Sequence, residues 1–250
     1  RGRYYYPSFP AVSQAGSVAG RGEAEHLSQN ASIPVRRLTP CAIIMCHGGM
    51  SKGGKRPMET PVAQARLILA SGSPRRRELL AYFGLPFVVV PSEAEENAAG
   101  SGLEQVAALA RAKGEDVWAR YPGLPVLSAD TLVCLDDQVL GKPETPADAQ
   151  RMLQMLSGRW HFVYTGVCLR TPDGVLRERV ETTRVRFRRL TAGEIAGYVQ
   201  TGEPMDKAGA YAMQGVGGIF VERIDGSPSN VIGLPLATVA VLLASAGLVG

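Results

Sequence analysis

The chain has 250 residues, of which 45% are hydrophobic and 20% are charged, enough to bury a core in one or two domains. Its net charge of +4 and its pI near 9.0 would suit a nucleic-acid ligand, but the charge is unevenly distributed. Residues 1–66 carry nine basic and three acidic side chains, a net +6, so the remaining 184 residues carry 18 basic and 20 acidic groups, a net −2. This distribution argues against a nucleic-acid partner for the larger part.

The first 66 residues differ from the rest in pattern as well as in charge. They are rich in Gly, Ser and Ala and show no sustained helix or strand period. Their one apolar run, residues 42–46, is too short for a signal-peptide core or a membrane span, so we expect no membrane partner. We interpret residues 1–66 as a disordered extension or translated upstream sequence, with Met50 or Met58 as natural starts; a transit peptide is the alternative.

One stretch of this extension resembles a phosphate-binding P-loop. Residues 49–56 nearly match the pattern G-x-x-x-x-G-K-[ST]. Arg56 stands where a hydroxyl would hold Mg²⁺, and Pro57 follows where a helix should continue. We therefore interpret the match as accidental.

The four cysteines indicate a reducing compartment. Cys41 and Cys46 lie in the extension, whereas Cys134 and Cys168 lie in apolar, strand-like runs, and the spacing fits neither a disulfide framework nor a C-x-x-C metal pair. Cys41, Cys46 and His47 could be drawn as a metal cluster, but a loose tail is the better interpretation. We predict a cytoplasmic protein.

From Leu67 onward, apolar runs and turn residues predict an alternation of strands and helices. The predicted strands are residues 67–70, 87–90, 125–135, 160–170, 175–190 and 219–224. The predicted helices are residues 74–83, 103–121 and 146–156, a short one after Thr191 and a last one from Pro235. Because a hairpin with its turn at residues 172–174 interrupts the alternation, we predict an α/β fold with a mixed, twisted sheet and flanking helices in one domain, residues 67–250.

The helix over residues 103–121 carries an unusual lysine. Its apolar stripe consists of Leu103, Val106, Ala110 and Val117. The helical step from Ala110 leads to Lys113, so a charged side chain interrupts the face that should be buried.

The turn from the first strand into the first helix has the composition of an anion site. Ser73 is a natural N-cap, and Pro74 suits the first helical position. Arg75, Arg76 and Arg77 oppose the helix dipole at this end, which makes sense if an anion lies in front of them. A solvated basic first turn explains the arginines equally well when the turn is considered alone.

Acidic residues lie within one predicted strand and directly after another. Asp130 falls inside a strand that is apolar on both faces, so its carboxylate needs a metal, a lysine or a proton, although buried structural aspartates also occur. Glu95 and Glu96 follow the second strand and could reach a metal, although a solvated acidic loop is the simpler explanation.

Two further lysines complete a set of groups that phosphoryl chemistry uses. Lys142 follows the strand of Asp130 in a Gly-Lys-Pro turn, and Lys207 opens a loop of small residues that a ligand could approach closely. Cations, a carboxylate and a metal together stabilise developing phosphoryl charge. His161, the only histidine after residue 66, lies in an apolar strand, so we expect it to be structural and expect no Ser/His/Asp triad.

Six motifs in collinear order over residues 67–245 resemble those of Maf proteins. They are Ser71-Gly72-Ser73-Pro74-Arg75-Arg76-x-Glu78-Leu79-Leu80, Ser128-Ala129-Asp130-Thr131, Gly141-Lys142-Pro143, Leu156-Ser157-Gly158, Lys207-Ala208-Gly209-Ala210-Tyr211-x-x-Gln214-Gly215 and Asp225-Gly226-Ser227-x-x-Asn230-Val231-x-Gly233-Leu234-Pro235-Leu236. The resemblance implies a nucleotide pyrophosphatase with a divalent metal, Mg²⁺ or Mn²⁺, that converts a nucleoside triphosphate to the monophosphate and pyrophosphate. It also implies a Maf/ITPase-like α/β fold with a deep nucleotide cleft, often assembled as a homodimer.

The resemblance also implies roles for single residues. Asp130 matches the proposed general base, and Glu96, or less well Glu95, matches the acid that helps Asp130 hold the metal. Lys113 and Lys142 match residues that contact the phosphates and stabilise charge on them. The substrate-binding positions would be Ser71, Ser73, Arg75, Arg76, Thr131, Lys207 and Gln214.

The same resemblance implies a substrate branch. The branch that acts on dTTP and UTP carries the equivalents of Arg75, Thr131 and Gln214, whereas the branch that acts on 7-methyl-GTP differs there. A glutamine amide can pair with the carbonyl and N–H edge of a pyrimidine, which gives Gln214 a physical role. Glu95-Glu96 stands where many relatives have Asp-Glu, so the metal ligands could differ slightly.

Two other functions fit the same residues. One is a non-enzymatic nucleotide-binding regulator of septum formation, since Maf proteins are also associated with septum formation and division arrest. The other is a pyrophosphatase for modified nucleotides. The presence of Asp130, Lys113 and Lys142 favours turnover over mere binding.

Overall fold

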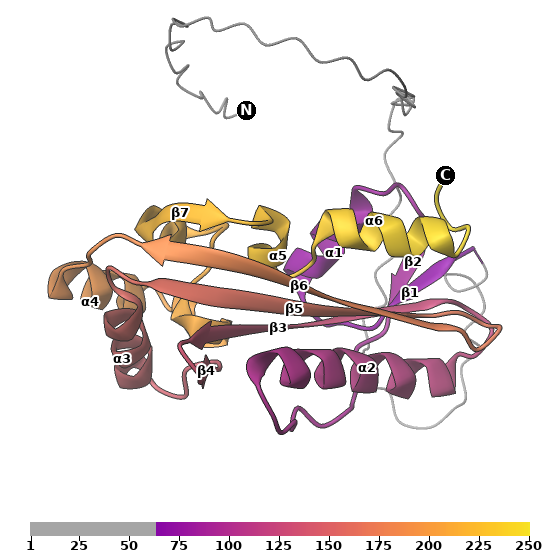
Figure 1. Cartoon of the computed structure of the whole chain (residues 1–250), viewed down its shortest axis with the longest axis horizontal. Helices are drawn as coiled ribbons and strands as arrows, with labels where there is room; N and C mark the ends of the chain where they lie inside the picture. Colours follow the sequence, from indigo (N-terminus) through magenta and orange to yellow (C-terminus); the bar gives the residue numbers. More distant parts are fainter. Residues whose placement is uncertain (1–63) are drawn as a thin grey trace, which may run out of the picture. The chain divides into compact units, whose positions relative to one another are not determined.

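A computed structural model describes residues 64–250 (Figure 1). The extension up to residue 63, with its P-loop-like stretch and Cys41 and Cys46, lies outside the described residues.

The strands of the described residues form one mixed sheet. They are β1 (Leu67–Leu69), β2 (Phe87–Val89), β3 (Val126–Leu135), β4 (Gln138–Leu140), β5 (Trp160–Arg170), β6 (Leu176–Phe187) and β7 (Val221–Asp225). Their order is β2-β1-β3-β5-β6-β7, and β4 also pairs with β3. Strand β1 runs parallel to β2 and β3, and the other pairs are antiparallel. The predicted mixed α/β sheet is therefore confirmed.

Helices follow the strands much as the sequence predicts. They are α1 (Pro74–Ala81), α2 (Gly102–Arg120), α3 (Pro146–Leu156), α4 (Ala192–Gln200), α5 (Pro228–Ile232) and α6 (Leu236–Ser245), with 3₁₀ turns η1 (Glu203–Asp206), η2 (Ala208–Ala210) and η3 (Val216–Phe220). The predicted N-cap Ser73 accepts a backbone N–H, as does Thr145 before α3, and Thr191 forms a capping box with Glu194. Within residues 64–250, no helix combines the length and the apolar character needed to cross a membrane.

Two local predictions were wrong, and two short elements were missed. Ile219 and Phe220 belong to η3, and β7 begins only at Val221. Leu103, predicted to face the core, is 44% exposed because it lies in the first turn of α2, at the end of the face that packs on the sheet. The short elements β4 and α5 were not predicted, because three to five residues carry too little periodicity.

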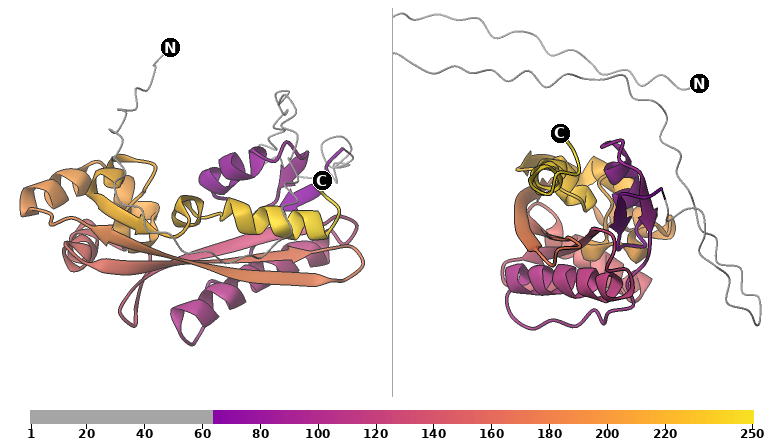
Figure 2. Two further views of the ribbon diagram at one scale, coloured as in Figure 1. Left: turned by 45° about the horizontal axis from the view of Figure 1, so that its top comes forward. Right: turned by 90° about the vertical axis from the view of Figure 1, so that its right-hand side faces the viewer.

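The two faces of the sheet are covered by different helices. Figure 2 shows α2 on one face and α1 and α6 on the other. On the α2 face, Val117 packs with Ile68 and Val126. On the opposite face, α1 and α6 pack over one end of the strands, and α3 and α4 pack over the other end.

The two cores on that opposite face are separated by polar side chains. Along β3, Ala129 belongs to the core under α1 and α6, whereas Val133 belongs to the core under α3 and α4. Thr131 lies between them and faces Thr165, its directly paired neighbour on β5. The hydroxyl oxygens of the two threonines are 3.0 Å apart, so a pair of polar side chains separates the two apolar cores.

His161 is an internal residue of the core under α3 and α4. It is 0% exposed, and its Nε2 lies 3.0 Å from the hydroxyl of Tyr211. The rings of Phe187 and Tyr211 pack edge-on against it, with centroids 5.0 and 5.5 Å away. Burial lowers the pKa of His161 to about 3, so the imidazole is neutral in the folded protein at ordinary pH.

The buried neutral imidazole predicts a pH-dependent stability. The unfolded chain takes up a proton near the ordinary pKa of 6.5, whereas the folded chain does so only near 3. The contribution is therefore complete above pH 6.5, and the free energy of unfolding should fall by about 1.4 kcal/mol per pH unit below it. Urea unfolding between pH 7 and pH 5 measures this slope.

Two variants test the origin of the slope. His161→Leu should remove most of it, whereas Tyr211→Phe, which keeps the imidazole and removes only its hydrogen-bond partner, should retain it. An unchanged slope in His161→Leu would assign the pH dependence to another group.

Candidate active site

The candidate active site lies beside an interruption in the pairing of β3. Strand β5 pairs with β3 along one edge, from Val126 to Cys134. On the other edge β1 pairs only with Val126 and Leu127, and β4 pairs only from Val133 onward. Residues 128–132 therefore have no strand neighbour on that edge. The alternation of the strand directs the backbone N–H and C=O groups of Ala129 and Thr131 into this gap, since Leu127 O already accepts from Ala70 N.

The turn after β1 borders the gap. Strand β1 ends at Leu69, and the chain then turns into α1 with Ser73 as N-cap and Pro74 in the first turn. Ser71 Oγ accepts from Ser73 N at 3.2 Å, which folds the turn back on itself. The first turn of α1 carries no acidic side chain, so the positive end of the helix is not neutralised locally.

Arg76 is fixed across the gap by neutral oxygens. Its Nε donates to Gly233 O at 2.8 Å, one terminal nitrogen to Ser71 Oγ at 3.3 Å and the other to Thr131 Oγ1 at 3.0 Å. It forms no ion pair with any carboxylate of residues 64–250. Burial lowers the pKa of Arg76, against the opposing effect of the nearby Asp130 charge. An anion between the guanidinium and the helix terminus would therefore be stabilised from both sides.

On the other face of the sheet, α2 packs unusually close to β3 and β5. A Cβ on Gly166 of β5 would lie 2.4 Å from Val106 O, and one on Gly114 of α2 would lie 2.7 Å from Ser128 Oγ. The buried Ser128 hydroxyl donates to Ala110 O at 2.6 Å, which ties the strand to the helix backbone. This close packing places Lys113, which directly precedes Gly114 on α2, over β3.

Lys113 connects two of the three acids that the sequence singled out. Its ammonium donates to Asp130 Oδ1 at 2.6 Å and to Glu96 Oε1 at 2.7 Å. The side chains of Lys113 and Asp130 are only 12% and 11% exposed, so a lysine is the partner of this carboxylate, one of the three possibilities that the sequence left open. Lys142, after β4, lies 3.9 Å from Glu96 Oε2. Glu95 is exposed and takes no part in these contacts.

The loop that carries Glu96 is held against α2. Asp116, one turn after Lys113, accepts from Ser92 Oγ at 2.9 Å and from Glu93 N at 2.8 Å, and it also pairs with Arg120. The hydrogen bond and the charge of Lys113 lower the pKa of Glu96, so Glu96 stays ionised over the neutral range. Asp116 was not singled out from the sequence, although its helical spacing from Lys113 puts both on one side of α2.

A third group of charges surrounds Asp206. The carboxylate of Asp206 pairs with Lys207, and its other oxygen lies 4.0 Å from Arg75 Nη1. Lys207 also donates to Glu203 O at 3.3 Å. The following loop is tied to the turn after β4, because Gly209 N donates to Gly141 O at 3.0 Å. Gln214, farther along, is exposed and has no side-chain hydrogen bond within the described chain.

The acids of the site suit a metal that is shared with a substrate. Among the described residues, no three His, Cys, Asp or Glu side chains are grouped closely enough to hold a metal alone. Asp130 and Glu96 bind one ammonium and so lie near each other. Mg²⁺ in nucleotide enzymes commonly uses one or two carboxylates together with water and phosphate oxygens, which this pair could supply.

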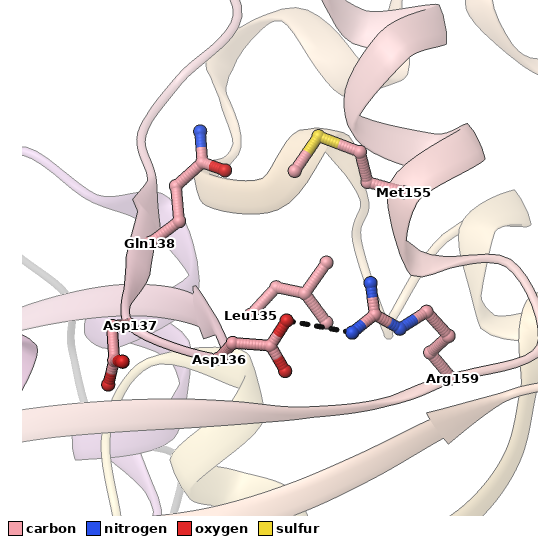
Figure 3. A pocket seen from close by; sticks show the side chains of 6 residues that line it. All are labelled: Leu135, Asp136, Asp137, Gln138, Met155 and Arg159. Atoms are coloured by element: carbon pink, nitrogen blue, oxygen red, sulfur yellow. Dashed lines mark hydrogen bonds and ion pairs between the residues drawn. The ribbon is translucent and has the colours of Figure 1, made fainter.

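A separate open pocket lies beside the turn between β3 and β4 (Figure 3). Its lining residues are Leu135, Asp136, Asp137, Gln138, Met155 and Arg159. Asp136 accepts from Arg159 at 2.8 Å, so these two charges neutralise each other. None of the predicted site residues lines this pocket.

Comparison with known proteins decides the family. A model described as "Maf-like protein" matches residues 66–246. The chain belongs to the Maf-like protein family. The dTTP/UTP pyrophosphatase of Methylobacillus flagellatus is 48% identical over 190 residues, which cover 74% of this chain and 95% of that protein. The dTTP/UTP pyrophosphatase of Moorella thermoacetica is 51% identical over 189 residues, which cover 73% and 96%.

The Maf-like chain also has a distant likeness to a solved structure. A HAM1 protein from Coxiella burnetii is 18% identical, with a TM-score of 0.43, over 72% of this chain and 99% of that one.

The structure brings most of the sequence-predicted residues of the Maf-like chain into three neighbouring groups. The groups are Asp130, Lys113, Glu96 and Lys142; Ser71, Ser73, Arg76 and Thr131; and Arg75 and Lys207. Asp206 and Gly233 O were not predicted as parts of the site. Asp206 directly precedes the predicted Lys207, but nothing in the sequence shows that it also approaches Arg75.

The close packing of α2 predicts a strong effect of one methyl group. In Gly166→Ala the new Cβ would meet the carbonyl of Val106, so α2 must move away and carry Lys113 from Asp130. We expect the free energy of unfolding to fall by about 1–3 kcal/mol, measured by urea unfolding, as for other overpacked sites. Gly197→Ala is the control, because its Cβ would meet nothing within 4 Å on the exposed side of α4. It should stabilise the protein slightly.

Proposed function

We propose that this chain is a nucleoside triphosphate pyrophosphatase that hydrolyses dTTP and UTP to the monophosphate and pyrophosphate. The observation that carries the proposal is the pairing of two neighbouring features. One is the Asp130–Lys113–Glu96 cluster, and the other is Arg76, which has neutral partners only. The names of relatives about 50% identical over almost their whole length support the same activity.

The proposed reaction is an attack of water on the α-phosphorus. Asp130 uses one oxygen for Lys113, and its second oxygen accepts the proton of the attacking water. The new bond joins the water oxygen to the α-phosphorus, and the bond between that phosphorus and the α–β bridging oxygen breaks. The bridging oxygen leaves with the pyrophosphate. Lys113 and Lys142 stabilise the negative charge that develops on the phosphoryl oxygens.

The triphosphate would bind between the turn after β1 and the Lys207 loop. Arg76, the hydroxyls of Ser71 and Ser73 and the backbone N–H of Arg75 in the first turn of α1 would bind the β- and γ-phosphates. Arg75 and Lys207 would add charge from the other side.

A divalent metal, Mg²⁺ or Mn²⁺, is the proposed cofactor, with Asp130 and Glu96 as its protein ligands. Bound there, it would neutralise phosphate charge and lower the pKa of a coordinated water. The Lys113 ammonium holds the two carboxylates in place beforehand and keeps Glu96 ionised.

The proposed preference for a pyrimidine rests on the three residues that match the dTTP/UTP branch, Arg75, Thr131 and Gln214. The exposed amide of Gln214 has no partner in the described chain and would be available to a base edge. The cytoplasmic location, the homodimer, the absence of nucleic-acid and membrane partners and the deep cleft stay predictions. The alternatives of a non-enzymatic regulator and of a pyrophosphatase for modified nucleotides make different predictions in the assay below.

The first test is the product released by purified protein with dTTP or UTP and Mg²⁺ or Mn²⁺. We expect pyrophosphate and the monophosphate, and a kcat about 10²–10⁴-fold lower in Asp130→Asn, the effect of losing a general base. Asp137→Asn, which removes an acid from the separate pocket, is the matched control and should retain full activity.

Four outcomes would contradict parts of the proposal. Release of orthophosphate instead of pyrophosphate would exclude cleavage between the α- and β-phosphates. Full activity of Asp130→Asn would exclude Asp130 as the base. Binding without turnover would favour the regulator, and a strong preference for modified nucleotides would favour the other alternative.

The second test concerns the charge of Asp206. In the free protein this carboxylate neutralises Arg75 and Lys207, which the triphosphate would need. Asp206→Asn should therefore lower the KM for dTTP about two- to threefold, a modest change because the carboxylate is 73% exposed. Steady-state kinetics measures it.

Asp136→Asn is the matched control, because Asp136 is equally exposed and pairs with Arg159 away from the site. It should leave KM unchanged. A higher KM in Asp206→Asn would mean that Asp206 holds Lys207 in place instead of competing with phosphate.

A further inference from the structure

Arg76 belongs to a closed ring of hydrogen bonds that joins four elements of the fold. One arm runs from Arg76 to Thr131 Oγ1 at 3.0 Å, then to Thr165 Oγ1 at 3.0 Å and on to Asn230 O at 3.2 Å. The other arm runs from Arg76 Nε to Gly233 O at 2.8 Å, and Gly233 N donates to Asn230 O at 2.9 Å. The ring connects α1, β3, β5 and the end of α5.

Each hydrogen bond between the hydroxyls of this ring has only one possible donor. A threonine hydroxyl has one proton, and the proton of Thr165 is used on Asn230 O. Thr165 must therefore accept from Thr131, and the Thr131 proton points away from Arg76. Only lone pairs of Thr131 Oγ1 face the guanidinium, so both arms run from the cation toward one carbonyl.

The far end of the ring is anchored by a buried side chain. Asn230 is 0% exposed, and its Nδ2 donates to Val163 O and to Thr183 Oγ1, both at 3.0 Å. Thr183 in turn accepts from Ser227 N at 3.0 Å, at the N-cap of α5. These bonds set the position of the Asn230 carbonyl with respect to β5 and β6.

We infer that Thr165 is a positioning residue for the phosphate-binding face of Arg76. Thr165 lies on β5, directly paired with Thr131 of β3, and is 0% exposed, so it does not reach a ligand itself. By accepting the Thr131 proton, it keeps Thr131 as an acceptor for Arg76 and leaves the remaining guanidinium N–H groups directed at the anion. This inference rests on the proposed function of Arg76.

Without the Thr165 hydroxyl, the proton of Thr131 has no acceptor. The Thr131 proton can then turn toward Arg76, where it repels the guanidinium N–H that Thr131 Oγ1 accepts. The guanidinium thereby loses one of its three fixed contacts. The expected consequence is weaker binding of phosphate groups, with little change in the chemical step.

The test is binding of inorganic pyrophosphate to the full chain with Mg²⁺, measured by calorimetry, together with KM and kcat for dTTP. Thr165→Val removes the hydroxyl at nearly constant volume. It should weaken pyrophosphate binding and raise KM about five- to tenfold, the loss expected for one hydrogen bond, with kcat within about twofold of the original. Thr165→Ser, which restores the hydroxyl, should recover the affinity.

A matched control separates positioning from general stability. Thr171→Val also removes a buried threonine hydroxyl, but at the β5–β6 turn, where it bonds to Asp173 and Val175 O. It should reduce the free energy of unfolding without changing pyrophosphate affinity. If Thr165→Val does not fold, Thr165→Cys, with a weaker donor of similar size, takes its place with the same expected direction.

A double-mutant cycle tests whether Thr165 acts through Arg76. In an Arg76→Lys background, Thr165→Val should have no additional effect on pyrophosphate affinity, because the acceptor geometry no longer serves a guanidinium. Additive losses, or unchanged affinity in a folded Thr165→Val, would overturn the inference. Tight pyrophosphate binding by the original protein without turnover would refute the proposed activity and leave this inference standing.

Discussion

The site depends on how closely α2 can approach the sheet. Gly166 on β5 and Gly114 on α2 leave no room for a side chain between helix and strands, and Ser128 bonds directly to the helix backbone. At this separation the ammonium of Lys113 reaches Asp130 inside β3 and Glu96 on the neighbouring loop. A larger separation would leave a carboxylate within a strand without its cation, which is costly in a poorly solvated place.

The second constraint is the interruption of β3 pairing between β1 and β4. A continuous sheet would use every backbone group of β3 and leave no edge for a ligand. Here residues 128–132 have a free edge, with the α1 turn on one side and the turn after β4 on the other. Asp130 directs its side chain to the α2 face and Thr131 to the opposite face, so one strand contributes both to the Asp130–Lys113–Glu96 cluster and to the contacts of Arg76.

The sequence predicts the parts of the site that depend on local pattern. A lysine within an apolar helical stripe and an aspartate within an apolar strand each signal a buried charge, and the structure joins Lys113 to Asp130. The N-cap Ser73 and the hairpin turn at residues 172–174 are equally local and were predicted. The contacts of Arg76 with Gly233 and of Thr131 with Thr165 join segments that are far apart in the chain, so no spacing rule reveals them. Ile219 was wrongly assigned to a strand because a short apolar run does not distinguish a strand from a 3₁₀ turn.

The central claim of the proposed function is that water attacks the α-phosphorus of a pyrimidine nucleotide. Hydrolysis of dTTP or UTP in H₂¹⁸O, with mass spectrometry of both products, tests it most directly. The account predicts that the label enters the nucleoside monophosphate and that the pyrophosphate stays unlabelled. Label in the pyrophosphate would mean attack at the β-phosphorus and would contradict the account.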